Sequence, residues 1–268
     1  MPGKKRSPSV MFDPKEVTIV MEGVFRFIDI KIALYNYYNM CSKIIISSYF
    51  DTPENKKIKE TILCEYPNVE IIDNCPEEVD DISQPIAPLL LKGGQLFVHM
   101  PNLLNKVTTP YVIKTRVDQA FTNMEYFIEK TVSNPHKITC FPYYVRAYDR
   151  RKFHPPDMLI GSSTAIMRDV WCNPYDAEIR RTREIIEQCV FEGYICRALQ
   201  GQGCTEDLHS LTPARYGVLM SRLFDVIDHR KLQPYSVHGY DNFFSQSEYR
   251  QFDPSLENNT VVFFEKGC

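Results

Sequence analysis

An alternation of short β-branched runs with longer helical strings is the feature that most limits how this chain can fold. Val17-Thr-Ile-Val-Met-Glu-Gly23 predicts a buried strand, residues 26–40 predict a largely buried helix, and residues 43–49 predict a second strand. A polar-faced helix over Pro53–Glu65 and a third strand over Val69–Asp73 follow. This order predicts right-handed βαβ crossovers and a parallel sheet.

The remainder of the chain continues the alternation after an interruption. Residues 74–94 contain Pro76, Pro85 and Pro88 without a reliable period, and we expect a functional or mobile loop there. Beyond the loop, the patterns predict helices over about 95–105, 124–132, 178–199 and 214–227, and strands over 111–118, 137–141, 158–167 and 261–264. We expect a flexible tail over residues 1–16 and one domain over 17–268.

Composition excludes several classes of protein. With 268 residues, 44% of them hydrophobic, the chain has enough apolar material for a full-sized core. A net charge of −3 argues against a dedicated nucleic-acid binder. Nine cysteines with no CxxC pair predict reduced thiols, and we find no secretory signal and no apolar run long enough for a membrane helix. A cytoplasmic, not membrane-spanning protein is the expectation.

Polar residues follow four predicted strands at the point where each strand ends. They are Glu22 and Gly23, Ser47 and Ser48, Asp73 and Asn74, and Arg116 with Asp118. Open parallel sheets bind ligands outside the carboxyl ends of their strands, so these residues are candidates for binding a nucleotide. Taken singly, each residue is better explained as an ordinary turn or cap residue, and only their coincidence at four successive strand ends raises the functional interpretation to an equal footing.

The predicted strand Tyr111-Val-Ile-Lys-Thr-Arg-Val-Asp118 is the strongest local signal. Lys114, Arg116 and Asp118 would bring two cations and a carboxylate to one edge of the sheet. A diphosphate bridged by Mg²⁺ or Mn²⁺ needs such a combination, because these ions bind carboxylates together with phosphate oxygens. The alternative is a structural ion pair between Arg116 and Asp118.

Four blocks of the sequence resemble those of WavE-type lipopolysaccharide-synthesis glycosyltransferases, a family with related sequences in large DNA viruses. The blocks are residues 17–23, 44–48, 111–118 and 153–162, the last reading Phe-His-Pro-Pro-Asp-Met-Leu-Ile-Gly-Ser. The resemblance covers about residues 17–200 and leaves the last quarter of the chain unmatched. It implies an α/β, GT-A-like (Rossmann-like) fold with a mixed, mostly parallel central sheet flanked by helices. The nucleotide-binding half would span about 17–118, and the acceptor half with a C-terminal extension about 119–268.

The resemblance also implies a nucleotide-diphosphate-sugar donor and a divalent cation, Mn²⁺ or Mg²⁺. Asp118 takes the place of the last acid in the family's metal motif, and His238 is a candidate for a second ligand late in the chain. The motif is usually Asp-x-Asp, whereas Arg116 stands here at the first acid. Arg116 and Lys114 are therefore an alternative, metal-free source of positive charge for the diphosphate. For His238 the alternative is a surface or structural histidine.

Two acids are candidates for the base that activates an acceptor hydroxyl. Asp157 matches the acid of the Pro-Pro-Asp block, and Glu192 corresponds to the acid on the family's long helix. Glu192 also lies on the apolar stripe of the predicted helix over 178–199, where partial burial would raise its pKa toward the useful range. The alternatives are a structural ion pair for Glu192 and a turn or helix cap for Asp157.

Together these features predict a glycosyltransferase, either a hexosyl- or a pentosyltransferase. It would move a sugar from a nucleotide-diphosphate sugar to a hydroxyl of a glycan or glycoconjugate. We expect the configuration of the sugar to be inverted. A nucleotidyltransferase is one alternative, although the Gly-rich loop typical of that class is replaced by Glu22-Gly-Val-Phe-Arg26. A non-catalytic glycan-binding protein with a degenerate transferase fold is the other. Nucleotide binding separates the last alternative from both enzymes.

Overall fold

A computed structural model gives the fold of this chain. It describes residues 12–23, 25, 27–50, 52–74, 99–141, 158–172, 212, 214, 218, 221–232, 234–237 and 240–241. The strands are β1 (Val17–Glu22), β2 (Lys43–Ser48), β3 (Val69–Asp73), β4 (Tyr111–Arg116), β5 (Ala120–Phe121), β6 (Ile138–Cys140), β7 (Ile160–Ser163), β8 (Phe224–Val226), β9 (Pro234–Val237) and β10 (Tyr240–Asp241). The helices are α1 (Phe27–Tyr37), α2 (Pro53–Glu65), α5 (Met124–Ser133), α6 (Thr164–Trp171) and α11 (His229–Leu232), with a 3₁₀ turn over Pro14–Glu16 and helical residues at 99–105.

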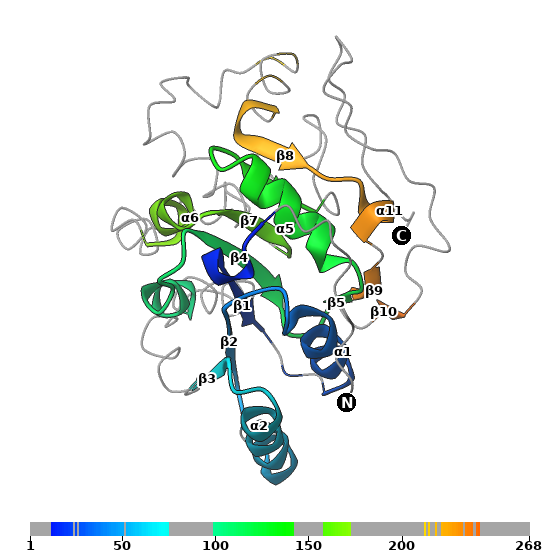
Figure 1. Cartoon of the computed structure of the whole chain (residues 1–268). Helices are drawn as coiled ribbons and strands as arrows, with labels where there is room; N and C mark the ends of the chain where they lie inside the picture. Colours follow the sequence, from blue (N-terminus) through cyan, green and yellow to red (C-terminus); the bar gives the residue numbers. More distant parts are fainter. Residues whose placement is uncertain are drawn as a thin grey trace.

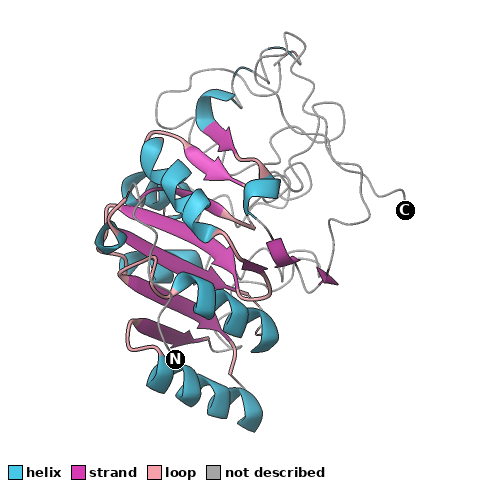
Figure 2. Ribbon diagram, turned by 45° about the vertical axis from the view of Figure 1, so that its right-hand side comes forward, coloured by secondary structure: helices cyan, strands magenta, loops and turns pink. Residues whose placement is uncertain are grey.

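A seven-stranded sheet in the order β3-β2-β1-β4-β7-β6-β8 forms the centre of the molecule (Figure 1). Its pairings are parallel except for those that β7 makes with β4 and β6. Helices flank the sheet (Figure 2). The predicted fold class, an α/β fold with a mixed and mostly parallel sheet between helices, is confirmed.

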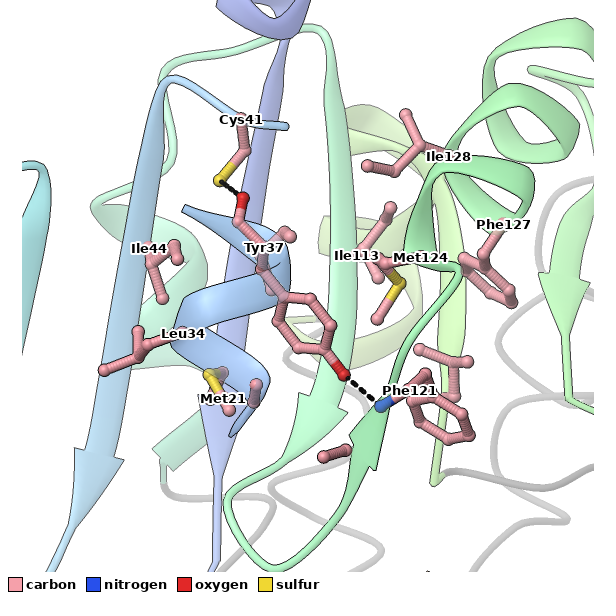
Figure 3. Close-up of a cluster of buried hydrophobic side chains, with 14 of the residues drawn as sticks. Met21, Leu34, Tyr37, Cys41, Ile44, Ile113, Phe121, Met124, Phe127 and Ile128 are labelled. Carbon is pink, nitrogen blue, oxygen red and sulfur yellow. Dashed lines mark hydrogen bonds between the residues drawn. The ribbon is translucent and has the colours of Figure 1, made fainter. Parts of the chain in front are cut away.

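Alternation along the strands separates two faces of the sheet. Residues such as Ile19, Ile44 and Ile113 point to one face, where they join side chains of α1 and α5 in a single buried cluster (Figure 3). Within this cluster the hydroxyl of Tyr37 accepts a hydrogen bond of 2.8 Å from the backbone N–H of Phe121. The end of α1 is thereby fixed to β5, next to the carboxyl end of β4.

Gly161 allows α5 to pack closely on β7. A Cβ atom at this position would lie 2.6 Å from Oγ1 of Thr131 and 2.9 Å from Cε1 of Phe127, both on α5. Such distances are far shorter than ordinary van der Waals contacts, so no larger side chain fits without displacing the helix.

Three predictions about individual elements are wrong in part. The predicted strand over 158–167 ends at Ser163, whose hydroxyl accepts a hydrogen bond from the N–H of Ile166 and caps α6. The predicted helix over 214–227 gives way to β8, which pairs with β6. Helix α1 is buried along one side only, since Ile28 and Tyr35 are exposed.

A second, three-stranded sheet in the order β10-β9-β5 lies beyond the carboxyl ends of the main parallel strands (Figure 2). Ala120 of β5 pairs with Ser236 of β9, and Val237 pairs with Tyr240 of β10. The sequence patterns did not predict this sheet. It brings the chain near residue 240 back to the segment that follows β4.

In the part of the chain that the structure describes, no helix has the length and apolar character needed to cross a membrane. The cysteines in that part, Cys41, Cys64, Cys140 and Cys172, are free thiols. The predicted helix over 178–199 and the predicted strand over 261–264 lie outside the described residues.

Candidate functional site

The strand register brings the predicted site residues of β1, β2 and β4 to one edge of the sheet. Glu22 is aligned with Ser47 on one side and with Arg116 on the other, and Ser48 is aligned with Asp73. We call Glu22, Gly23, Ser47, Asn74, Lys114, Arg116 and Asp118 the strand-end cluster. Its members come from the carboxyl ends of four strands that are adjacent in the sheet.

Alternation excludes two predicted residues from this cluster. Ser48 and Asp73 point to the opposite face from Ser47, and both are used within the fold. The Ser48 hydroxyl donates a 2.7 Å hydrogen bond to the carbonyl of Gly23. The Asp73 carboxylate accepts from the N–H of Phe50 at 3.2 Å and from Nζ of Lys59 at 2.9 Å.

A buried ion pair lies in the middle of the strand-end cluster. Nζ of Lys114 is 3.6 Å from Oε1 of Glu22, and their side chains are 0% and 7% exposed. Charged groups with so little access to water are tolerated only when an opposite charge lies nearby. Lys114 thus lies two residues inside the edge of the sheet, and Glu22, the last residue of β1, is its partner at that edge.

Arg116 and Asp118 form a second pair at the end of β4. Nε and Nη2 of Arg116 donate to Oδ1 and Oδ2 of Asp118 at 2.8 and 2.9 Å, a planar two-bond arrangement. The structural ion pair considered as an alternative from the sequence is therefore present. Gly23, with φ of +125°, turns the chain beside this guanidinium, and a Cβ there would lie 3.6 Å from Nη2.

A neutral hydrogen-bonded chain occupies the ends of β2 and β3. The Ser47 hydroxyl donates to Oδ1 of Asn74 at 2.9 Å, and Nδ2 of Asn74 lies 3.3 Å from Nδ1 of His99. Because Ser47 fixes the amide oxygen, the amide nitrogen is the donor and Nδ1 the acceptor. The sequence patterns missed His99, which lies in the predicted helix over 95–105 among apolar residues and carries no motif of its own.

The described residues contain no group of three or more His, Cys, Asp or Glu side chains placed to hold a metal ion. Asp118 is the carboxylate at the end of β4, and both of its oxygens accept from Arg116. A cation at Asp118 would therefore need further ligands beyond these residues. The predicted base candidates Asp157 and Glu192 and the predicted ligand His238 lie outside the described residues.

Sequence comparisons do not assign the chain to a family. No family model matches it, and no curated protein matches it. The resemblance to the WavE-type family therefore stays a prediction from the four sequence blocks.

Solved structures that match the chain are distant. The galactosyltransferase LgtC, in complex with donor and acceptor sugar analogues, has 9% identity and a TM-score of 0.46 over 68% of this chain and 70% of that chain. Mouse xyloside xylosyltransferase 1 has 9% identity and a TM-score of 0.41 over 80% and 85%. The 4-diphosphocytidyl-2C-methyl-D-erythritol synthase of Anaerococcus prevotii has 12% identity and a TM-score of 0.37 over 67% and 83%. Likenesses at this level concern only the arrangement of strands and helices and establish no function.

Proposed function

We propose that this protein is a glycosyltransferase that moves a sugar from a nucleotide-diphosphate sugar to a hydroxyl of a glycan or glycoconjugate. The observation that carries the proposal is the strand-end cluster, in which a guanidinium, a glycine with positive φ and a hydrogen-bonded amide follow one another along one edge of a mostly parallel sheet. That edge is where sheets of this kind bind nucleotides.

The order of side chains along the edge matches the order of groups in a nucleotide. Arg116, at the end of β4, has the charge and planar donors that suit a diphosphate. Ser47 and Asn74, two and three strands away, offer neutral donors and acceptors that suit a base. Gly23 lies between them, and its lack of a side chain lets a ligand approach the backbone closely.

Charge balance supports a requirement for additional positive charge. Within the strand-end cluster, Lys114 pairs with Glu22 and Arg116 pairs with Asp118, so the formal charges of the four side chains cancel. A bound diphosphate would leave a negative excess there. We propose that Mn²⁺ or Mg²⁺, if bound here, would supply this positive charge as a Lewis acid.

Asp118 and His238 are the proposed protein ligands of this cation. The pairing of β5 with β9 supports this choice of ligands. Ala120, two residues after Asp118, is paired with Ser236, which is two residues before His238. Asp118 and His238 would hold the cation, and the guanidinium of Arg116, which donates to both oxygens of Asp118, would then be available to the diphosphate.

The base of the transfer reaction is a residue outside the described part of the chain. In the proposed inverting reaction, Asp157 or Glu192 takes the proton from the acceptor hydroxyl as that oxygen attacks the anomeric carbon. The bond from the sugar to the diphosphate breaks, and Arg116 stabilises the leaving charge. We further propose that the chain is a WavE-type enzyme, because four blocks of its sequence resemble that family.

A binding and product assay tests the proposal. Thermal unfolding is measured with UDP, GDP, CDP and their common sugars, each with and without Mn²⁺. A ligand at a hundredfold excess over its dissociation constant stabilises the folded protein by about 2.7 kcal/mol. We expect one nucleotide class to raise the melting temperature, and its sugar to be converted to free nucleoside diphosphate. Release of pyrophosphate from a nucleoside triphosphate supplied together with a sugar phosphate would instead indicate a nucleotidyltransferase, and no shift with any ligand would contradict the proposal.

Asp118→Asn tests the metal. The amide keeps the size of the side chain but is a much poorer ligand for a divalent cation. We expect the variant to bind nucleotide in the absence of Mn²⁺ at least as tightly as the unaltered protein, because the Arg116 guanidinium no longer pairs with a carboxylate, and to lose the additional shift that Mn²⁺ produces. Glu70→Gln is the matched control, because Glu70 also pairs with lysines but lies near the start of β3. An Asp118→Asn protein with a full response to Mn²⁺ would exclude Asp118 as a ligand.

A further inference from the structure

We propose that Glu22 binds the ribose 2′- and 3′-hydroxyls of the nucleotide donor, and that buried Lys114 acts as a positioning residue through Glu22. The proposal rests on the nucleotide-binding function above and assigns one part of the ligand to one side chain. It also changes the role of Lys114, which the sequence had suggested as a direct contact of the diphosphate.

Burial determines what Lys114 can reach. Its side chain is 0% exposed, and its neighbours in register are Val20 on β1 and Ile160 on β7, so it lies inside the sheet rather than at the edge. Glu22 is aligned with Arg116, so it lies two residues nearer than Lys114 to the carboxyl ends of the strands. Its Oε1 is 3.6 Å from Nζ of Lys114. A ligand at the strand ends therefore meets Glu22 before it meets Lys114.

The register places Glu22 at the position of the ribose. Neighbouring strands lie about 4.8 Å apart, so Arg116, Glu22 and Ser47 form a row with one side chain per strand. Arg116 suits the diphosphate and the Ser47–Asn74 pair suits the base. Glu22 lies between them, so it would face the ribose, which joins the diphosphate to the base in a nucleotide.

The chemistry of Glu22 fits a diol. An ionised carboxylate only accepts hydrogen bonds and has two oxygens, and the Lys114 ammonium lies nearest to one of them. A ribose offers two adjacent O–H donors, and a carboxylate held in one orientation can accept from both. A 2′-deoxyribose offers one donor fewer, which leaves part of a buried anion unsatisfied and lowers affinity.

Calorimetric titration with matched nucleotides tests the inference. The dissociation constants of UDP, GDP and CDP are compared with those of dUDP, dGDP and dCDP for the unaltered protein, Glu22→Gln, Lys114→Met and the double variant. We expect the unaltered protein to favour the ribonucleotide by about tenfold to a hundredfold, as for the loss of one hydrogen bond to a charged group. In all three variants this ratio should fall to about threefold or less.

The double variant and one control keep the result interpretable. Removing both charges leaves no buried ion alone, so the Glu22→Gln/Lys114→Met protein should fold even if a single variant does not. Glu70→Gln breaks lysine–glutamate pairs elsewhere in the protein and should keep the full preference for ribonucleotides. If the Glu22 and Lys114 variants lost the preference only because the protein is less stable, Glu70→Gln would lose it as well. A protein that binds nucleotides with no preference for ribose, or a Glu22→Gln protein that keeps the preference, overturns this inference while the proposed function stands. Failure of every nucleotide to bind overturns both.

Discussion

At the scale of single residues, two glycines are required for different reasons. Gly161 is needed because α5 packs against its Cα, whereas Gly23 is needed because of its backbone conformation. At Gly23 an added Cβ would meet only ordinary contacts, the shortest of them 3.6 Å, but φ of +125° is a conformation that residues with a Cβ rarely adopt. Strain, rather than a clash, is what a substitution at Gly23 would introduce.

Gly23→Ala should therefore destabilise the protein by about 1 to 2 kcal/mol. The cost arises in the folded backbone, so urea denaturation should show a lower midpoint with an unchanged slope. Because the strain is relieved by moving the chain beside Arg116, nucleotide affinity should fall as well. An alanine variant as stable as the unaltered protein would show that the turn does not require glycine.

From the sequence one can predict which polar residues stand at the strand ends, but not to which face of the sheet each side chain points. The polar positions at the strand ends were identified because each follows an apolar run. Which of two consecutive residues belongs to the strand-end cluster depends on register and on alternation along the strands. Ser47 and Ser48 are therefore indistinguishable without their partners, Asn74 and the Gly23 carbonyl. His99 was missed because its partner is distant in sequence.

At the scale of elements, a charged clamp joins β2, β3 and the turn after helical residues 99–105. Glu70 of β3 lies 2.5 Å from Nζ of Lys43 on β2 and 2.5 Å from Nζ of Lys106. The hydrogen bonds from Lys106 and Lys43 hold the pKa of the Glu70 carboxyl below its usual range. Glu70 thus connects three segments at the end of the sheet remote from the strand-end cluster.

Glu70→Gln should lower stability at neutral pH and make no difference in acid. A carboxyl whose pKa is lower in the folded state stabilises the protein above its unfolded pKa, and this stabilisation is lost as the pH falls through the folded pKa. Because the side chain is about a third exposed, we expect a difference of about 0.5 to 1 kcal/mol at pH 7, smaller at high salt. Urea denaturation at pH 7 and pH 3 measures it, and an equal difference at both would refute the clamp.

Element boundaries were predictable where a cap or a proline marks them. Helix α2 begins at Pro53 after Thr52, whose hydroxyl accepts from the N–H of Asn55, and the sequence predicted its bounds correctly. The join between β7 and α6 was missed because the run from Ile160 to Met167 is too short for its period to separate strand from helix. Ser163 was the only marker of this boundary, and a serine is equally compatible with the interior of a strand.

At the scale of the whole molecule, the strand pairings between segments close in sequence were predictable, and those between distant segments were not. Strands β1, β2 and β3 follow one another with helices between them, so local patterns suffice. The positions of β8 and β9 depend on pairing with β6 and β5, and no local pattern carries that information.

Cysteine reactivity should report the stability of the whole molecule. Cys41 is buried beneath α1, where it donates to the carbonyl of Tyr37, and burial raises the pKa of its thiol to about 12. Cys64 on α2 is exposed. In the folded protein at pH 8, iodoacetamide should label Cys64 and leave Cys41 unmodified until global unfolding. Mass spectrometry of each site measures this, and comparable labelling of Cys41 under native conditions would indicate local opening of α1.

The pairing of β5 with β9 has a consequence for how the protein is made. Strands β1 to β4 can associate once the first part of the chain has left the ribosome, but the segment after β4 must wait for partners far along the sequence. Asn123, for example, donates to the carbonyl of Lys231, 108 residues later. Closing such long loops slows folding and leaves strand edges unpaired in the meantime. The edge that bears Asp118 is therefore completed late in synthesis, and a chain truncated before residue 234 should acquire a sheet without a finished site.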